Sequence, residues 1–217
     1  MAQSTIFEPM EQNIERVQKP LLAEQIANAK LVLVKGPRKV GKEALIADVL
    51  NEQNQAYCQV NCQDKKNRKA IEEGDFFASV SEAIIVLEEA QYLSNLQQIL
   101  EAVLMGKINH NLIISCSFKP AIEEELLEAL RIEGMDFTIY APSFYESAQH
   151  FGLTKEEELL EQRLIYGNYP SVLANLDEAD FTLKTMIEEL IHTQLGAHDR
   201  VNKGCLLYTS PSPRDRY

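Results

Sequence analysis

A short, glycine-containing stretch of this sequence, Gly36-Pro-Arg-Lys-Val-Gly41-Lys42, has residue types that suit phosphate binding. Glycine lets the backbone turn so that successive N–H groups point inward at phosphate oxygens. The start of a following helix adds a partial positive charge, and Lys42 can reach the outer phosphates of a nucleoside triphosphate. The pattern therefore predicts an ATP-binding loop formed by Gly36, Pro37, Arg38, Lys39, Val40, Gly41, Lys42 and Glu43.

The segments on both sides of this loop fit the Walker A motif, which requires a strand before it and a helix after it. Residues 31–34 are wholly apolar, as buried parallel strands are. Residues 42–51 place Leu45, Ile46, Val49 and Leu50 on one helical face. The alternative interpretation is a glycine-containing turn between a strand and a helix, with its lysines in solvent.

The residue after Lys42 departs from the motif. Ser or Thr is expected there because its hydroxyl binds Mg²⁺, but this chain has Glu43. A carboxylate also binds Mg²⁺, yet it brings negative charge beside the phosphates. We expect nucleotide binding to tolerate this change better than efficient hydrolysis does.

A pair of carboxylates follows a second apolar run, Ile84-Ile-Val-Leu-Glu88-Glu89. This is the form of a Walker B strand, in which the first carboxylate supports the metal and the second orients the attacking water. We therefore assign Glu88 and Glu43 as Mg²⁺ ligands and Glu89 as the catalytic residue, although Glu88 stands where Asp is usual. Two like charges would compete at one ion, which predicts altered metal handling. The alternative is a buried strand that ends in a charged loop.

Further polar candidates come later in the chain. Ser115 and Ser117 stand where related ATPases carry a polar sensor of the γ-phosphate. Arg131 and Arg163 are candidate charge-stabilising arginines, with solvated surface residues as the alternative. The histidines, which form no cluster in the sequence and so predict no histidine catalysis, are His110, His150, His192 and His198. The cysteines, which lack metal-ligand spacing and are predicted to be reduced thiols, are Cys58, Cys62, Cys116 and Cys205.

Composition limits the class of protein. A chain of 217 residues, 45% hydrophobic and 25% charged, can bury one domain core and a fragment of a second. Its net charge of −12 does not support a nucleic-acid surface, but it leaves room for a local basic site. No apolar run is long enough to cross a bilayer, and the polar N-terminus is not a signal peptide. We expect a cytoplasmic protein without membrane contact, whose partners are a nucleotide and an unidentified protein.

Strands and helices alternate along the first two thirds of the chain. Strands are predicted at residues 31–34, 56–60, 83–87, 111–115 and 137–140. Helices are predicted at residues 21–29, 42–51, 93–104 and 122–130, and a polar loop at residues 61–69. Such alternation implies parallel pairing. The predicted fold class is α/β, a P-loop NTPase (AAA+-like) parallel sheet flanked by helices.

The pattern becomes helical beyond Pro142, which predicts a small C-terminal helical subdomain. We divide the chain into a P-loop ATPase core at residues 1–142, a helical subdomain at residues 143–204 and a tail at residues 205–217. The tail has no periodicity and resembles the translation of a transposase-type sequencing adapter; the alternative is a natural Ser/Pro-rich tail. On the adapter interpretation, the natural protein is expected to continue past Gly204.

These features together resemble the prokaryotic AAA-type P-loop ATPases that carry a C-terminal domain called DUF4143. The matching stretches, in the family's order, are Gly36-Pro-Arg-Lys-Val-Gly-Lys, Ile84-Ile-Val-Leu-Glu-Glu-Ala-Gln, Ile113-Ile-Ser-Cys-Ser, Pro142-Ser-Phe-Tyr-Glu and Tyr166-Gly-Asn-Tyr-Pro. The chain departs from the family's pattern at Glu43, Glu88 and Cys116, and the C-terminal domain is missing from it. The resemblance implies an AAA+-like core but supplies no substrate.

Two functions are consistent with the sequence. The first is an ATP-binding domain with slow ATP hydrolysis, whose nucleotide state moves a C-terminal module; Lys42 and Glu89 favour it. The second is a non-hydrolysing, degenerate P-loop module that serves interaction; Glu43 and Glu88 favour that. Magnesium-dependent turnover distinguishes the two.

Overall fold

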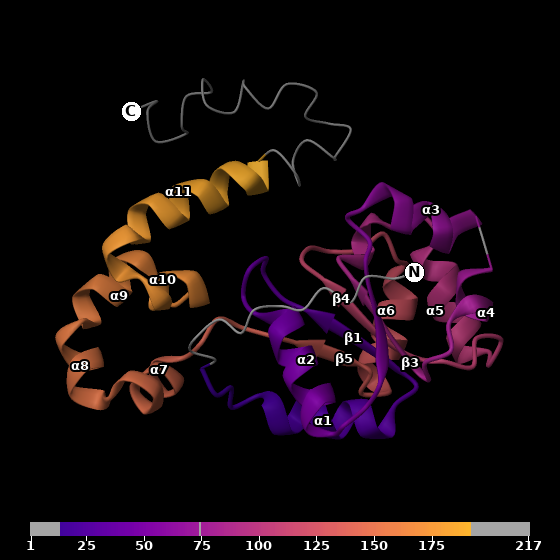
Figure 1. The fold of residues 1–217 in the computed structure, drawn as a ribbon, viewed down its shortest axis with the longest axis horizontal. Helices are drawn as coiled ribbons and strands as arrows, with labels where there is room; N and C mark the ends of the chain where they lie inside the picture. The colour runs from indigo at the N-terminus through magenta and orange to yellow at the C-terminus, as the bar shows by residue number, and fades with distance from the viewer. Residues whose placement is uncertain (1–13, 74, 192–217) are drawn as a thin grey trace. The chain divides into compact units, whose positions relative to one another are not determined.

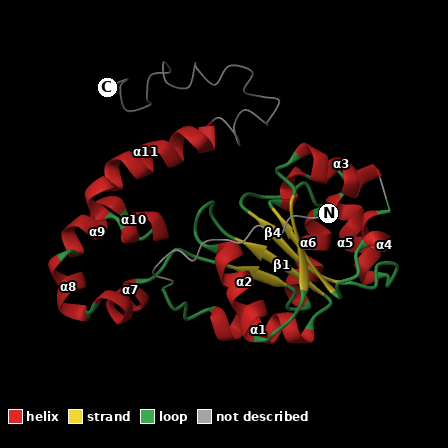
Figure 2. Ribbon diagram, in the orientation of Figure 1, coloured by secondary structure: helices red, strands yellow, loops and turns green. Residues whose placement is uncertain are grey.

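The fold is built around one parallel five-stranded sheet, seen in the computed structural model, which describes residues 14–73 and 75–191 (Figures 1 and 2). The strands are β1 (Leu31–Lys35), β2 (Tyr57–Asn61), β3 (Ile84–Glu88), β4 (Asn111–Cys116) and β5 (Asp136–Thr138). Their order across the sheet is β2-β3-β4-β1-β5. The predicted α/β fold with a parallel sheet is confirmed.

Helices cover both faces of this sheet. Those that occur in the chain before β5 are α1 (Lys19–Asn28), α2 (Lys42–Glu52), α3 (Lys65–Glu73), α4 (Phe76–Ser79), the 3-10 turn η1 (Ala90–Tyr92), α5 (Leu96–Leu104) and α6 (Glu124–Ile132). Side chains alternate between the two faces because successive residues of a strand point in opposite directions. In β1, Leu31 and Leu33 pack in the cluster that holds α5 and α6, whereas Val32 and Val34 pack in the cluster that holds α1 and α2.

The strand order determines which chain segments meet. All pairings are parallel, so the carboxyl ends of the strands lie at one edge of the sheet. β4 lies between β1 and β3. The segment that follows β4 is therefore placed between the loop after β1 and the carboxylates at the end of β3.

One predicted element is wrong. The predicted polar loop at residues 61–69 contains the start of α3, which runs from Lys65 to Glu73. This helix is highly polar, and Ile71 is its only buried residue, so its sequence lacks the apolar stripe by which amphipathic helices are recognised.

The described part of the chain divides into two compact units, on either side of the Glu157–Glu158 bond. The helices that follow β5 are α7 (Phe144–Phe151), α8 (Leu153–Glu158), α9 (Leu160–Tyr166), α10 (Pro170–Ala174), the 3-10 turn η2 (Leu176–Glu178) and α11 (Ala179–Leu190). α7 and nearly all of α8 belong to the first unit, with the sheet. The predicted helical character beyond Pro142 is confirmed. The predicted tail at residues 205–217 lies outside the described residues.

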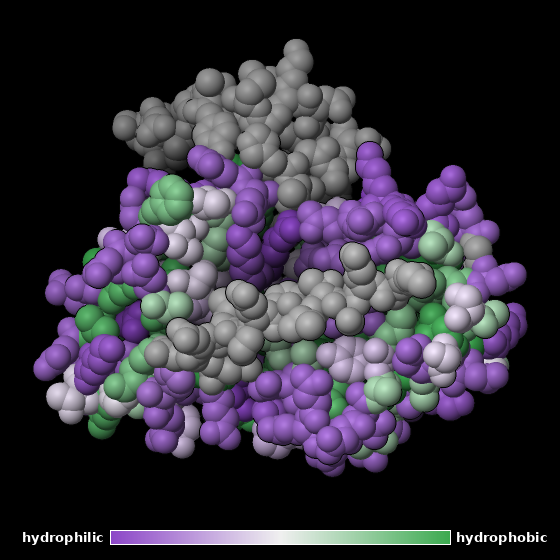
Figure 3. All heavy atoms as spheres, in the orientation of Figure 1, coloured by the Kyte–Doolittle hydropathy of each residue, from purple (hydrophilic) through white to green (hydrophobic). Residues whose placement is uncertain are grey.

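The second unit has little apolar core of its own among its described residues. Val172, Leu173 and Ala179 are buried, while Leu164 on α9 and Phe181 on α11 are 79% and 71% exposed. Figure 3 shows one face of the molecule, on which hydrophilic residues predominate and hydrophobic ones form separate patches. Among residues 14–73 and 75–191, we find no helix with the length and apolar character of a membrane span.

Candidate functional site

The loop between β1 and α2 is shaped by its two glycines. A Cβ atom on Gly36 would lie 2.4 Å from the carbonyl oxygen of Ile139, so no other residue fits without moving the backbone. Gly41 has φ 94° and Lys39 has φ 60°, both in the left-handed region that L side chains rarely adopt. The Gly36 N–H donates to the Cys116 carbonyl at 3.3 Å, which fixes the start of the loop to the end of β4.

Lys42 lies in the first turn of α2, and its side chain is fully buried. A buried ammonium is costly unless oxygen acceptors replace its water. Here Nζ donates to the Pro37 carbonyl at 3.0 Å and to Ser117 Oγ at 2.9 Å. The lysine of the predicted phosphate loop is thus folded back over its own loop and held by the segment that follows β4.

Glu89 lies directly after β3 and is 7% exposed. The Ser117 hydroxyl, which accepts from Lys42, donates to Glu89 Oε1. The other carboxylate oxygen accepts from Gln91 Nε2 at 2.8 Å, and Gln91 Oε1 accepts from the Ser117 N–H at 3.2 Å. Glu89 has φ 51°, a conformation that non-glycine residues adopt mainly where the surroundings enforce it. The hydrogen bonds from Ser117 and Gln91 hold the Glu89 carboxylate in one orientation.

Glu43 and Ser115 meet on the face of the sheet that α2 covers. Ser115 Oγ donates to Glu43 Oε1 at 3.0 Å and accepts from the Glu89 N–H at 3.4 Å. Ser115 is fully buried. Ser115 thus connects the Glu43 carboxylate to the residue that follows β3.

Glu88, the last residue of β3, is 7% exposed and accepts from Gln59 Nε2 on the neighbouring strand β2. Burial raises the pKa of Glu88 above its ordinary value. The hydrogen bond from Gln59 stabilises the charged form and so lowers this pKa. The nearby carboxylates of Glu43 and Glu89 raise it further. This crowding of negative charge is what a divalent cation relieves.

The donor set fits Mg²⁺, which the fold implies. Glu43 and Glu88 supply hard carboxylate oxygens, and Mg²⁺ is bound at nucleotide sites by one or two carboxylates together with phosphate oxygens and waters. In residues 14–73 and 75–191, no group of three or more His, Cys, Asp or Glu side chains could hold a metal ion by itself.

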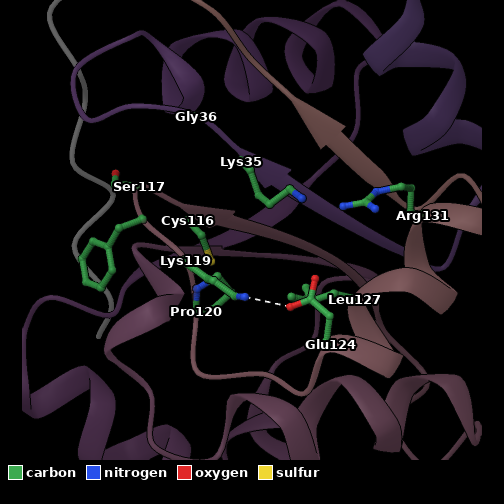
Figure 4. Close-up of a pocket in the computed structure, with 10 residues that line it drawn as sticks. Lys35, Gly36, Cys116, Ser117, Lys119, Pro120, Glu124, Leu127 and Arg131 are labelled. Atoms are coloured by element: carbon green, nitrogen blue, oxygen red, sulfur yellow. Dashed lines mark hydrogen bonds and ion pairs between the residues drawn. The ribbon is translucent and has the colours of Figure 1, made fainter.

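A pocket of about 330 Å³ opens beside the loop, between Gly36, Ser117 and α6 (Figure 4). Figure 4 shows Lys35 and Arg131 directed toward each other on one side of it. Both approach Asp136, at 2.6 Å from Lys35 Nζ and 3.8 Å from Arg131 Nε. Arg131, a predicted charge-stabilising candidate, thus borders the site but is already paired.

Two further arginines were predicted candidates. Arg163 is on α9 in the second unit and is buried, and the Arg38 side chain of the loop donates to Gln63 at 2.9 Å. Burial, with the Glu89 carboxylate contributing, raises the pKa of the Cys116 thiol to about 12. Burial, with Glu88 contributing most among the charges, raises the pKa of Cys62 to about 12. Both thiols stay protonated near neutral pH and are poor nucleophiles.

Sequence reasoning missed the two glutamines that hold the site's carboxylates. Gln59 lies in the middle of β2, opposite Val86 of β3 and two residues before the position that pairs with Glu88, and this register identifies it once the strand order is known. Gln91 lies within the Glu-Glu-Ala-Gln stretch that was recognised, but no role was assigned to it there.

Comparison with known proteins gives two findings. A family model described as an AAA domain matches residues 28–148, which is more than half of the chain. The solved structure of the Walker-type ATPase PABY2304 of Pyrococcus abyssi superimposes with a TM-score of 0.53 at 18% sequence identity, covering 90% of this chain and 77% of that one. At this identity the likeness shows the fold alone. No curated protein matches the chain.

Proposed function

Because the chain belongs to the AAA domain family, we propose that its P-loop binds ATP together with Mg²⁺ and hydrolyses it slowly. The observation that carries the proposal is the connected set Lys42–Ser117–Glu89 at the carboxyl edge of the sheet. It joins the cation of the phosphate loop to the carboxylate of the predicted Walker B strand through one hydroxyl.

The chemistry follows from these positions. The backbone N–H groups of residues 38–42 and the Lys42 ammonium bind the β- and γ-phosphates. Glu89, held by Gln91 and Ser117, orients a water that attacks the γ-phosphorus. The bond from that phosphorus to the bridging oxygen breaks, giving ADP, phosphate and a proton. Glu43 and Glu88 would hold a Mg²⁺ ion, which would supply positive charge to the phosphate oxygens.

Slow turnover is the expected consequence of Glu43 and Glu88. Each is longer than the residue the motif normally has. Glu43 also adds negative charge near the transferred group, because the motif has a neutral hydroxyl at that position. The second candidate function is a non-hydrolysing interaction module that retains nucleotide. It is favoured by the environment of Glu88, whose pKa is raised and whose carboxylate accepts a hydrogen bond from Gln59. Resemblance to the DUF4143-carrying ATPases adds the proposal that nucleotide state acts on a C-terminal module.

The test compares the chain with Lys42→Ala. Loss of the Lys42 ammonium, which donates to the Pro37 carbonyl of the loop, should weaken MgATP binding at least tenfold, because a charge-assisted contact to phosphate is worth roughly 1.5–3 kcal/mol. Titration calorimetry measures the affinity, and phosphate release measures turnover. Lys69→Ala is the matched control, since Lys69 is 73% exposed on α3. Equal affinity in the chain and in Lys42→Ala would contradict the phosphate-loop assignment, and binding without any phosphate release would establish the second candidate.

A further inference from the structure

Arg16, which precedes α1, lies at a junction of three chain segments. Its side chain is 8% exposed, and its guanidinium donates from all three nitrogens. One nitrogen donates to the Val40 carbonyl at 3.2 Å, in the second half of the phosphate loop. Another donates to the Tyr140 carbonyl, and the third to Glu146 Oε1 at 3.2 Å. Arg16 therefore connects the loop to the segment that leads from β5 into α7.

Glu146 completes this junction from the side of α7, and it is 6% exposed. Its Oε2 accepts from the Ser143 N–H at 2.6 Å and the Ser143 hydroxyl at 2.8 Å, within the capping box that begins α7. Its Oε1 also accepts from the Val17 N–H at 2.8 Å. Burial alone would raise the pKa of Glu146, but these donors, led by the Ser143 N–H, together with Arg16 hold it below its ordinary value.

The same segment also contacts the beginning of the phosphate loop. The Ile139 N–H donates to the Lys35 carbonyl at 2.7 Å, and the Ile139 carbonyl occupies the space that a Cβ of Gly36 would need. Gln18 donates to the Thr138 carbonyl at 2.8 Å and accepts from the Tyr140 N–H at 3.3 Å. The loop is thus held at both ends by the chain between β5 and α7, and Arg16 forms the contact at the second end.

This placement has a physical reason. When the N–H groups of a phosphate loop point inward, carbonyl groups of the same loop are turned outward and need donors of their own. A guanidinium is suited to this task, since its fixed fork holds several acceptors at once, which an ammonium cannot do with the same geometry. The Val40 carbonyl has such a donor in Arg16.

We propose that Arg16 is a positioning residue for nucleotide binding, and that it couples occupancy of the phosphate loop to the docking of α7. The coupling is reciprocal: phosphates that hold the loop in the Arg16-bound geometry also stabilise the Arg16–Glu146 contact at the first turn of α7. This inference rests on the proposed binding of ATP at the same loop.

The experiment uses the whole chain and three variants. Arg16→Lys keeps the charge but loses the fork. Arg16→Gln with Glu146→Gln removes both charges, so no buried ion is left unpaired, and glutamine still suits the capping box. Lys19→Gln is the matched control: Lys19 joins the same N-terminal region to α2 through Asp48 and Glu52 but does not contact the loop. MgATP affinity is measured by calorimetry, amide hydrogen exchange is followed over Phe144–Phe151 with and without MgATP, and thermal unfolding checks the fold.

The unsubstituted chain and Lys19→Gln should bind MgATP alike, and MgATP should slow exchange in α7 in both. Arg16→Lys and the double variant should unfold cooperatively but bind at least about fivefold more weakly, the lower end of typical coupling, and should lose the protection of α7 by MgATP. If the Arg16–Glu146 ion pair only stabilises the fold, the double variant should bind MgATP with normal affinity. That result would overturn the proposal. Retained protection of α7 in Arg16→Lys overturns it as well. If the unsubstituted chain itself fails to bind MgATP, the proposed function falls, and this inference falls with it.

Discussion

The Nζ atom of Lys42 lies 2.9 Å from Ser117 Oγ, and the same hydroxyl donates to the carboxylate of Glu89. One neutral side chain therefore separates the buried cation from the buried anion. The Lys42 ammonium therefore already has hydrogen-bond acceptors in the chain without nucleotide. Because Ser117 contacts both charged groups, a movement of Ser117 would break its hydrogen bonds to Lys42 and Glu89 together.

Replacing Ser117 with Ala should destabilise the nucleotide-free chain by about 1–3 kcal/mol, because two buried charged groups each lose a hydrogen-bond partner. The loss should be smaller with MgATP, since phosphate oxygens then serve as acceptors for Lys42. Denaturant unfolding with and without MgATP measures both quantities. Ser81→Ala is the control, because Ser81 donates to Glu82 on the surface, and it should change stability by less than about 0.5 kcal/mol. An equal loss of stability with and without MgATP would show that Lys42 does not exchange its contact with Ser117 for phosphate oxygens.

Replacing Glu43 with Thr should raise magnesium-dependent hydrolysis by about tenfold, or about 1.4 kcal/mol in the barrier, because a like charge beside Glu88 is removed. Combining it with Glu88→Asp should raise hydrolysis further. Chelation of Mg²⁺ should weaken ATP binding more in the unsubstituted chain than in Glu43→Thr, whose site is less negative.

Glu124→Thr is the matched control for that experiment. Glu124 also lies in the first turn of a helix, α6, but it is exposed and paired with Lys119. Background hydrolysis in the double variant, with ATP still bound, would place the defect away from these two carboxylates.

Glu88 should make the stability of the fold depend on pH in a defined direction. Its folded-state pKa is raised above 4.5, chiefly by burial, so the native state holds the proton over a range where the unfolded chain has released it. Stability contributed by this group is fully present below pH 4.5 and is lost as pH rises through the raised pKa. Glu88→Gln should therefore be more stable than the unsubstituted chain at pH 7, with the difference vanishing toward pH 4.

Thermal unfolding between pH 4 and pH 7 measures whether Glu88→Gln is more or less stable than the unsubstituted chain. Glu72→Gln is the comparison variant, for which we expect the opposite effect at pH 7. The pKa of Glu72 is lowered, first by the Ser94 N–H and then by the Ser94 hydroxyl. Its charged form therefore stabilises the fold above pH 4.5, and its replacement should cost stability at pH 7. The prediction for Glu88 is wrong if Glu88→Gln is the less stable protein at pH 7.

Gly36→Ala should destabilise the fold by about 1–3 kcal/mol, the usual cost of overpacking, and should abolish MgATP binding. The added Cβ would lie 2.4 Å from the Ile139 carbonyl oxygen. Neither atom can rotate away, because the Cβ is fixed to its Cα and the carbonyl belongs to the backbone. Thermal unfolding and calorimetry measure the two effects. Gly106→Asn is the control, since Gly106 has φ 70° with no atom within 4 Å of a Cβ, and asparagine tolerates that conformation. Normal binding by Gly36→Ala would show that the loop can shift without losing its function.

The central strands were predictable because their sequences leave few alternatives. β1, β3 and β4 are apolar on both faces, and short apolar runs of this kind form buried parallel strands. α3 was not predictable on this basis, since it buries only Ile71 and is otherwise polar. The order of the strands is not predictable from local patterns, because it depends on how the connections between strands cross the sheet.

The site shows the same division. Gly36, Lys42 and Glu89 belong to motifs whose spacing is local, so their types and neighbours predict a role. Arg16 and Glu146 are 130 positions apart in the chain, and neither belongs to a motif with a known phosphate role. Gln59 is recognisable only after β2 is known to pair with β3. Residues that orient others across the fold leave no periodicity in the sequence.

The position of Arg16 affects how fragments of this protein should be cut. The matched AAA domain begins at residue 28, and a fragment trimmed to that boundary would lack Arg16, Gln18 and nearly all of α1. Such a fragment would keep every residue of the phosphate loop and still leave the Val40 carbonyl without its donor and Glu146 as an uncompensated buried charge. Poor yield or weak nucleotide binding in an expression trial of residues 28–148 would then reflect the choice of boundary, not the chemistry of the loop.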